Sequence, residues 1–351
     1  MKIAVLVSGG VDSSLALQLL HEQGHDLTAF YLKIWLEDEL SFLGDCPWEQ
    51  DLEYVKKLCE KLNIPLKVLS LQKEYHDLVV SYTIDQVKIG KTPNPDVLCN
   101  RLIKFGAFYD KIDEKFEKVA TGHYAKVVKQ GDLYVLQKTN DEIKDQTYFL
   151  SRLSKKQLSR AIFPIGHLTK SEVRDLASKY DLPSKDRKDS QGICFLGKIK
   201  FRDFLKQHLG VKTGDIIQFE TKEKLGEHEG FWYHTIGQRK GLGLSGGPWY
   251  VVSKDTEKNI VCVSNQYYSE EKRRDSIKVS GCHWISGNCP KNADLQVKIR
   301  HGQGVYDAQA NFQDDGNNGF IKIGENDQGI APGQFAVFYD KDVCLGSGVI
   351  L

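Results

Sequence analysis

The chain has 351 residues, enough for two or three domains, and its 40% hydrophobic and 27% charged residues are ordinary for a water-soluble protein. The formal net charge of +1 does not indicate a nucleic-acid partner, so any basic surface must be local. No apolar run approaches membrane-spanning length, and no signal or transit peptide precedes the first predicted strand. We therefore expect a cytoplasmic protein with no membrane partner.

The first predicted element is an apolar strand at residues 3–7, which leads directly into Ser8-Gly9-Gly10 and then into a helix. The two glycines allow backbone N–H groups to approach an anion, and the helix N-terminus adds partial positive charge. Asp12 would repel a phosphate unless a cation lay between them, and Mg²⁺ is the natural choice. A plain glycine turn would not explain Asp12 together with Ser13 and Ser14. The stretch therefore predicts a phosphate site.

Strands and helices alternate over the first part of the chain. Residues 27–34 and 66–71 read as strands, residues 52–62 as an amphipathic helix, and residues 35–49 as a loop. This rhythm predicts an α/β fold with a doubly wound parallel sheet. A later strand over 119–124 should bring Gly122 and His123 to the sheet edge that carries the first loop.

A second informative stretch surrounds Cys99. Asn94 fits the N-cap of a helix, with Pro95 at its first position and Asp96 in its first turn. Cys99 then lies about one turn into the helix, where a thiolate is favoured, and Asp96 is close enough to act as an acid or base. The residues alone leave open whether Cys99 is reactive or a core cysteine in a capped helix.

A third stretch, residues 184–194, combines the basic side chains of Lys185, Arg187 and Lys188 with a Gln-Gly turn directly before Cys194. The patch reads either as a solvated loop or as a place to hold phosphates. None of the eight cysteines forms a C-x-x-C pair, so a zinc ribbon is not indicated. We predict structural roles for the five cysteines Cys59, Cys262, Cys282, Cys289 and Cys344.

From residue 201 the rhythm changes. A helix over 201–209 is followed by short predicted strands at 214–217, 230–233, 246–252 and 259–263, and then by a charged linker at 270–275. Residues after the linker alternate between apolar and polar side chains with a period of two, which suggests a small β-barrel. We therefore predict three domains, over residues 1–205, 206–275 and 276–351, with helices 154–160 and 169–180 in the first.

Several segments carry a family resemblance. SGGVDSS resembles the PP-loop of ATP pyrophosphatases. Together with TPNPDVLCN, ATGHY, KDQTYFL, DSQGICFLG, HTIGQRKGLG, PWYVV and APGQ, in this order, it resembles the bacterial tRNA-uridine 2-sulfurtransferases. The resemblance implies ATP-dependent conversion of the wobble uridine of glutamate, lysine and glutamine tRNA to 2-thiouridine, with release of AMP and pyrophosphate. It also implies a PP-loop catalytic domain, a small central domain and a C-terminal β-barrel that contacts tRNA.

The same resemblance assigns roles to individual residues. Cys194 would carry a persulfide, Cys99 would attack it to leave a transient Cys99–Cys194 disulfide, and Asp96 would act as acid or base. ATP would be held by Leu6, Val7, Ser8, Gly9, Gly10, Val11, Asp12, Ser13, Leu32 and Gly122. Transfer RNA would be held by Asn94, Pro95, Asp96, His123, Lys144, Asp145, Gln146, Arg300, His301 and Gln334. A sulfur-relay protein or a cysteine desulfurase would supply the sulfur.

Two departures and three alternatives stay open. Family members often carry Tyr-Arg where this chain has His301-Gly302, and the loop at 36–48 differs from its usual acidic form. The chain could instead be a PP-loop ligase or amidotransferase acting on a small metabolite, or an RNA-binding protein that senses ATP. Cys99, Cys194 and Asp96 could also hold an iron–sulfur cluster in place of a persulfide.

Overall fold

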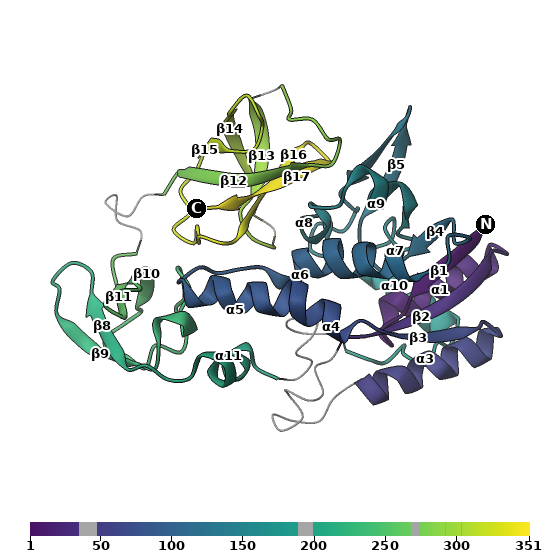
Figure 1. Cartoon of the computed structure of the whole chain (residues 1–351), viewed down its shortest axis with the longest axis horizontal. Coiled ribbons are helices and arrows are strands. Elements are labelled where there is room, and N and C mark those ends of the chain that lie inside the picture. The colour runs from purple at the N-terminus through teal and green to yellow at the C-terminus, as the bar shows by residue number, and fades with distance from the viewer. Residues whose placement is uncertain (35–47, 189–198, 268–273, 292, 303) are drawn as a thin grey trace.

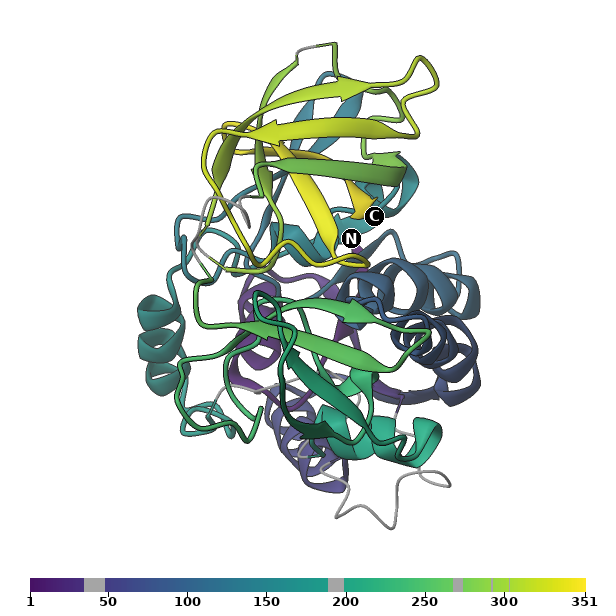
Figure 2. The same cartoon turned by 90° about the vertical axis from the view of Figure 1, so that its left-hand side faces the viewer.

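The computed structural model describes residues 1–34, 48–188, 199–267, 274–291, 293–302 and 304–351. Three parts follow one another along the chain (Figure 1): an N-terminal α/β domain, a small central domain and a C-terminal barrel. Turned by 90°, the barrel lies above the central domain, with the α/β domain behind them (Figure 2). Cys194 lies outside the described residues, as do residues 36–47 of the loop and most of the predicted charged linker.

The N-terminal domain is built on a five-stranded parallel sheet with the order β3-β2-β1-β4-β7. Its strands are β1 (Lys2–Leu6), β2 (Asp26–Lys33), β3 (Leu66–Ser70), β4 (Lys118–Ala120) and β7 (Ala161–Ile162). Side chains of β1 alternate between two buried clusters: Ile3 and Val5 belong to one, and Ala4 and Leu6 to the other. Helices therefore cover both faces, which confirms the predicted doubly wound sheet.

One face of the sheet carries α1 (Val11–Glu22), α3 (Trp48–Leu62) and α10 (Lys170–Lys179). The other carries two continuous helical runs: α4 (Gln72–Tyr75), η2 (His76–Val80) and α5 (Ser81–Lys88), then α6 (Pro95–Leu98), η3 (Cys99–Ala107) and α7 (Phe108–Lys111). The domain also contains α8 (Thr147–Leu150) and α9 (Lys155–Arg160). The predicted helix at 52–62 begins four residues earlier, at Trp48, because Glu49 and Asp51 favour a first helical turn.

Helix α11 (Phe201–Leu209), whose Phe204 and Leu205 are buried in the core of the first domain, leads into the central domain, which holds a four-stranded sheet with the order β10-β11-β8-β9. Its strands are β8 (Gly214–Gln218), β9 (Lys224–His228), β10 (Tyr250–Asp255) and β11 (Ile260–Ser264). The predicted strand at 230–233 is wrong: Phe231–Tyr233 form the short 3₁₀ helix η4, because Gly230 has a φ of +150° that ends the extended backbone. The predicted strand at 246–252 begins only at Tyr250.

The C-terminal domain is a closed six-stranded barrel, as predicted. Its strands are β12 (Ser276–Trp284), β13 (Asp294–Lys298), β14 (Tyr306–Phe312), β15 (Gly319–Ile323), β16 (Phe335–Asp340) and β17 (Val343–Ile350), and pairing of β12 with β17 closes it. An N-terminal-domain hairpin, β5 (Lys126–Gln130) and β6 (Leu133–Gln137), extends this sheet through pairing of β6 with β17. The barrel is thus fastened to the first domain by backbone hydrogen bonds.

Candidate active site

The loop after β1 is fixed by its own serines. The backbone N–H of Ser8 donates to Ser13 Oγ at 3.1 Å, and the hydroxyls of Ser13 and Ser14 donate to the Gly10 carbonyl at 3.2 and 2.9 Å. Gly9 has a φ of +76°, which a side chain would disfavour, and Gly10 is the N-cap of α1 without a side-chain cap. The first N–H groups of α1 therefore lie at a loop of fixed shape, as the predicted anion site requires.

Asp12 has two partners that the sequence analysis missed. Its Oδ1 accepts from Lys170 Nζ and from Tyr124 OH, both at 2.7 Å. Lys170 begins α10, far along the chain, and its charge offsets the repulsion that Asp12 would exert on a phosphate. Nothing local marks Lys170 as a site residue, because it reads simply as the first residue of a capped helix.

Gly122 approaches the loop as predicted. A Cβ placed on it would lie 2.6 Å from the backbone nitrogen of Ser13, so only glycine fits there without a shift. Leu6, Val7 and Val11 are buried around the loop, and Leu32 is half-buried near the carboxyl end of β2. The residues predicted to hold ATP thus gather at one edge of the parallel sheet.

Arg187, from the predicted basic patch, reaches the same loop. Its Nη1 donates to the Gly9 carbonyl at 2.9 Å, its Nη2 pairs with Asp51 at 2.6 Å, and its guanidinium lies 4.6 Å from the centre of the Tyr54 ring. Lys185 instead pairs with the exposed Asp181. Arg187, seven residues before Cys194 in the sequence, therefore contacts the loop that is predicted to hold phosphate.

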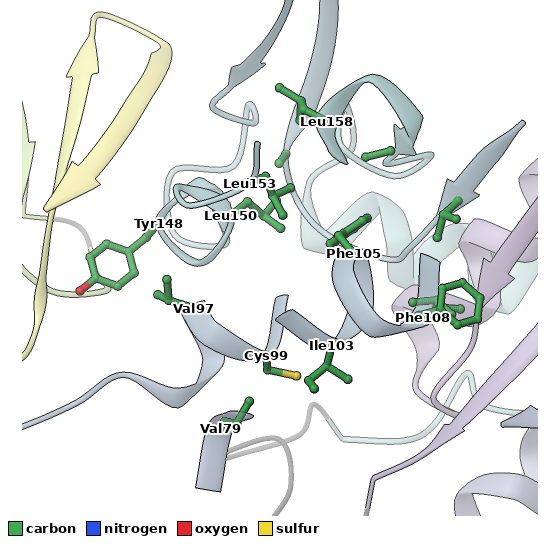
Figure 3. Close-up of a cluster of buried hydrophobic side chains, with 14 of the residues drawn as sticks. Val79, Val97, Cys99, Ile103, Phe105, Phe108, Tyr148, Leu150, Leu153 and Leu158 are labelled. Carbon is green, nitrogen blue, oxygen red and sulfur yellow. The ribbon is translucent and has the colours of Figure 1, made fainter. Parts of the chain in front are cut away.

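The turn that carries Cys99 forms as predicted. Asn94 Oδ1 accepts the Val97 N–H at 3.3 Å as the N-cap of α6, with Pro95 at its first position and Asp96 half-buried in its first turn. Cys99 is only 1% exposed, and its sulfur lies in the apolar cluster beside Ile103 (Figure 3). The Cys99–Cys194 disulfide stays a prediction, because Cys194 lies outside the described residues.

The barrel holds the loop before this turn. Gln334 Nε2 donates to the carbonyls of Thr92 and Pro93 at 2.9 and 3.4 Å, and the His301 ring stacks on Phe149 with centroids 4.4 Å apart. Gln334 and His301, two of the predicted tRNA contacts, are thus brought to the side of the domain that carries Asn94 and Asp96.

Other predicted tRNA contacts have protein partners. Asp145 is 3% exposed and pairs with the equally buried Lys298 at 3.1 Å, while Arg300 pairs with Asp327 at 2.6 Å. Gln146 Oε1 accepts the Tyr124 N–H at 3.0 Å, and Lys144 is half-buried. In this conformation Asp145 joins the two domains and does not reach a surface.

His123 is also buried. Its Nδ1 lies 2.7 Å from Thr121 Oγ1, and its ring packs against Phe163. Burial, with the charge of Lys104 as a smaller cause, holds the pKa of His123 well below its usual value, so the ring is neutral at pH 7. It is an internal hydrogen-bonding group in this conformation.

The cysteines predicted to be structural fit that role. Cys59 and Cys344 are buried, and the other three are half-buried. Burial raises the pKa of Cys59 to about 11 and that of Cys282 to about 12, so both thiols stay protonated and unreactive at pH 7. Within the described part of the chain, no three His, Cys, Asp or Glu side chains lie close enough together to hold a metal ion.

Comparisons with known proteins show which families the three parts of the chain resemble. Residues 1–198 match a family model described as a tRNA methyl transferase HUP domain, residues 202–265 a tRNA methyl transferase PRC-barrel domain, and residues 274–350 an aminomethyltransferase beta-barrel domain. The chain is 47% identical over 357 residues to the tRNA-specific 2-thiouridylase MnmA of Parabacteroides distasonis, a match that covers 100% of this chain and 99% of the relative. The chain belongs to the tRNA-specific 2-thiouridylase family.

A second 2-thiouridylase, MnmA 1 of Bacteroides thetaiotaomicron, is 48% identical over 356 residues, with coverage of 100% and 99%. Among solved structures, U34-tRNA thiolase NcsA from Methanococcus maripaludis with its [4Fe-4S] cluster shares 19% identity at a TM-score of 0.36, over 59% of this chain and 65% of that one. We draw no argument from so distant a structure. The 2-thiouridylase relatives confirm the predicted family, and no membrane-spanning helix is found among the described residues.

Proposed function

We propose that this enzyme transfers sulfur to C2 of the wobble uridine of tRNA and cleaves ATP to AMP and pyrophosphate. The glutamate, lysine and glutamine tRNAs would be its acceptors, in the cytoplasm. One observation carries the proposal. Asp96 and Cys99 lie on one turn, so this side of the site combines an acid–base group with a thiol. Gln334 of the barrel holds the loop directly before that turn.

The first step is activation of the base. The uracil C2 oxygen is a poor leaving group, and its attack on the α-phosphorus of ATP forms an adenylated base and releases pyrophosphate. The cradle of Gly9, Gly10 and Ser13 supports this step with backbone N–H groups, and Lys170 supplies positive charge beside Asp12. Asp12 is half-exposed and suited to bind Mg²⁺ as an oxygen ligand when ATP is bound.

The second step is sulfur transfer. The terminal sulfur of a Cys194 persulfide attacks C2, and the Cys99 thiolate then attacks the Cys194 sulfur. The transferred sulfur keeps the electron pair of the broken S–S bond, and AMP leaves with the pair of the C–O bond. The Cys99–Cys194 disulfide requires a two-electron reductant to reset it. Because Cys99 is buried, this step requires the apolar cover over its sulfur to open.

The proposal is tested by mass spectrometry of tRNA nucleosides after incubation with ATP, Mg²⁺, a thiol reductant and a persulfide donor, for which a cysteine desulfurase with free cysteine serves. We expect 2-thiouridine from the unaltered enzyme and a loss on the order of 10³-fold in Cys99→Ser and in Cys194→Ser, with pyrophosphate release retained. Cys59→Ser is the matched control, because Cys59 is a buried thiol on the opposite face of the sheet.

Three outcomes would favour the alternatives. Full activity in both cysteine variants would contradict the persulfide mechanism, and absence of 2-thiouridine from the unaltered enzyme would favour a PP-loop enzyme that acts on a small metabolite. Absence of pyrophosphate release with tRNA present would indicate an ATP sensor. Activity that follows bound iron in an anaerobic preparation would indicate an iron–sulfur thiolase. The cysteine desulfurase in this assay stands for the physiological donor, which we propose to be a sulfur-relay protein or a cysteine desulfurase.

A further inference from the structure

Two half-buried arginines flank the contact between η3 and α8, where the Asn100 side chain donates to the Phe149 carbonyl at 3.3 Å. Arg101 lies on η3, two residues after Cys99, and Arg152 follows α8. Arg152 Nη1 donates to the carbonyls of Gly281 and Ser347 on β12 and β17 at 3.0 and 3.3 Å, and its guanidinium lies 5.4 Å from the centre of the Phe335 ring. Figure 1 shows α8 beside this end of the barrel and above α6.

Neither arginine has a carboxylate partner among the described residues. Arg152 uses only Nη1, so its Nε and Nη2 hydrogens lack an acceptor in the described part of the chain, and no side-chain hydrogen bond of Arg101 is found there either. Their unpaired nitrogen atoms are not sealed from solvent. Both guanidinium groups therefore offer donors to a ligand that could reach the junction.

Burial makes the positive charge of the two arginines energetically unfavourable. Burial lowers the pKa of Arg152 to about 10, with the neighbouring Arg101 as a further cause, and burial also lowers the pKa of Arg101. His283, whose Nε2 lies 2.9 Å from the Leu153 carbonyl, has its pKa lowered by burial and by both arginines. Half-buried like charges without a counter-charge destabilise a fold unless an anion joins them.

We propose that Arg101 and Arg152 form a phosphate site that holds a backbone phosphate of the substrate RNA. Guanidinium groups match the tetrahedral oxygens of a phosphate through paired N–H donors, and they lose less hydration than an ammonium group on binding. The inference rests on the proposed function, because that function makes tRNA the phosphate-bearing substrate.

The position of the pair suits this role. Arg101 lies on the helical run that bears Asp96 and Cys99, and Arg152 lies three residues after Phe149, the ring that stacks on His301. A phosphate bound here would lie beside the β12–β17 edge of the barrel, whose carbonyls accept from Arg152. By neutralising the arginine pair, RNA binding would stabilise the domain junction that also places Gln334 on the loop before Asp96.

The test measures binding of labelled tRNA to Arg101→Gln as a function of salt concentration. Loss of one phosphate contact should weaken binding by roughly three- to tenfold at about 0.1 M salt and reduce the slope of log K against log [salt] by about 0.7–1. The loss should be equal for a tRNA whose wobble uridine is replaced by cytidine. Arg101→Lys should retain the slope, because it keeps the charge.

Arg202→Gln is the matched control, because it removes one charge from an exposed arginine that pairs with Glu229. An unchanged slope in Arg101→Gln, or an equal decrease in Arg202→Gln, would overturn the proposal. We choose Arg101 because Arg152 also donates to barrel carbonyls, so its loss would disturb the domain junction. Thermal unfolding of Arg101→Gln should occur at the same or a higher temperature than that of the unaltered enzyme, because the substitution removes one of two uncompensated charges. If unfolding occurs at a lower temperature, Arg101→Lys decides, and a slope lost despite the retained charge contradicts the site.

Binding of inorganic pyrophosphate distinguishes a site for an RNA phosphate from a site for a free phosphate. If Arg101→Gln weakens pyrophosphate binding while the salt slope for tRNA is unchanged, the site takes a free phosphate and the RNA assignment is wrong. The assay contains no ATP or sulfur, so its result is independent of catalysis. A lowered slope in an enzyme that forms no 2-thiouridine would refute only the proposed function.

Discussion

The two sides of the candidate site are built differently. The proposed phosphate cradle takes its shape from residues 8–14, which form hydrogen bonds with one another, and from Gly122 and Lys170 in the same domain. The side with Asp96 and Cys99 depends on another domain, because Gln334 of the barrel holds the loop before it and Asp145 pairs with the barrel's Lys298.

The difference indicates which side of the candidate site could form without the other domains. All residues of the cradle lie within one domain, so nucleotide binding should persist when the contacts between this domain and the barrel are weakened. The thiol side should not, since its loop and its stacked Phe149–His301 pair are held from outside the domain. Three substitutions test this contrast.

Asp145→Ala should have the largest effect. It leaves the charge of Lys298 buried and unpaired, and we expect the free energy of unfolding to fall by about 3–5 kcal/mol in urea titrations. The paired replacement Asp145→Leu with Lys298→Met should recover much of that loss. Where Asp145→Ala folds, ATP binding should persist while tRNA thiolation falls. Unchanged stability with weaker tRNA binding would show that Asp145 contacts RNA directly, as the family resemblance implies.

Gly122→Ala should act on the other side. The added methyl meets the backbone nitrogen of Ser13, and we expect a loss of about 1–3 kcal/mol in unfolding free energy together with weaker ATP binding by calorimetry. Gly304→Ala is the control, since its nearest contact would be an ordinary 3.5 Å. If ATP binds Gly122→Ala as tightly as the unaltered enzyme, the cradle is not the nucleotide site.

Gln334→Ala should have the smallest effect on stability, about 1 kcal/mol, because it removes one hydrogen-bonding side chain at a half-buried position. Its effect on turnover should be larger than its effect on the KM for ATP, since it frees the loop before Asp96 and leaves the cradle intact. Gln296→Ala, on the outside of the barrel, is the control. A change confined to the KM for ATP would contradict the separation of the two sides.

Local features were predictable from the sequence. The strand that leads into Ser8-Gly9-Gly10, the Asn94 cap of α6 and the helix at 169–180 all formed where expected, because each depends on residues within one or two turns. The family resemblance added the order of the domains, and the relatives confirm that family.

Long-range pairing was decided only by the tertiary structure. The β5–β6 hairpin looked like part of the first domain yet extends the barrel sheet, and Asp145 looked like a surface contact yet is buried against Lys298. Lys170 gave no local sign that it would reach Asp12. The sequence around a strand edge, a carboxylate or a lysine is the same whether that group meets water or a distant segment of the chain. The sequence therefore determined the helices, strands and caps, and the tertiary packing decided which distant groups they contact.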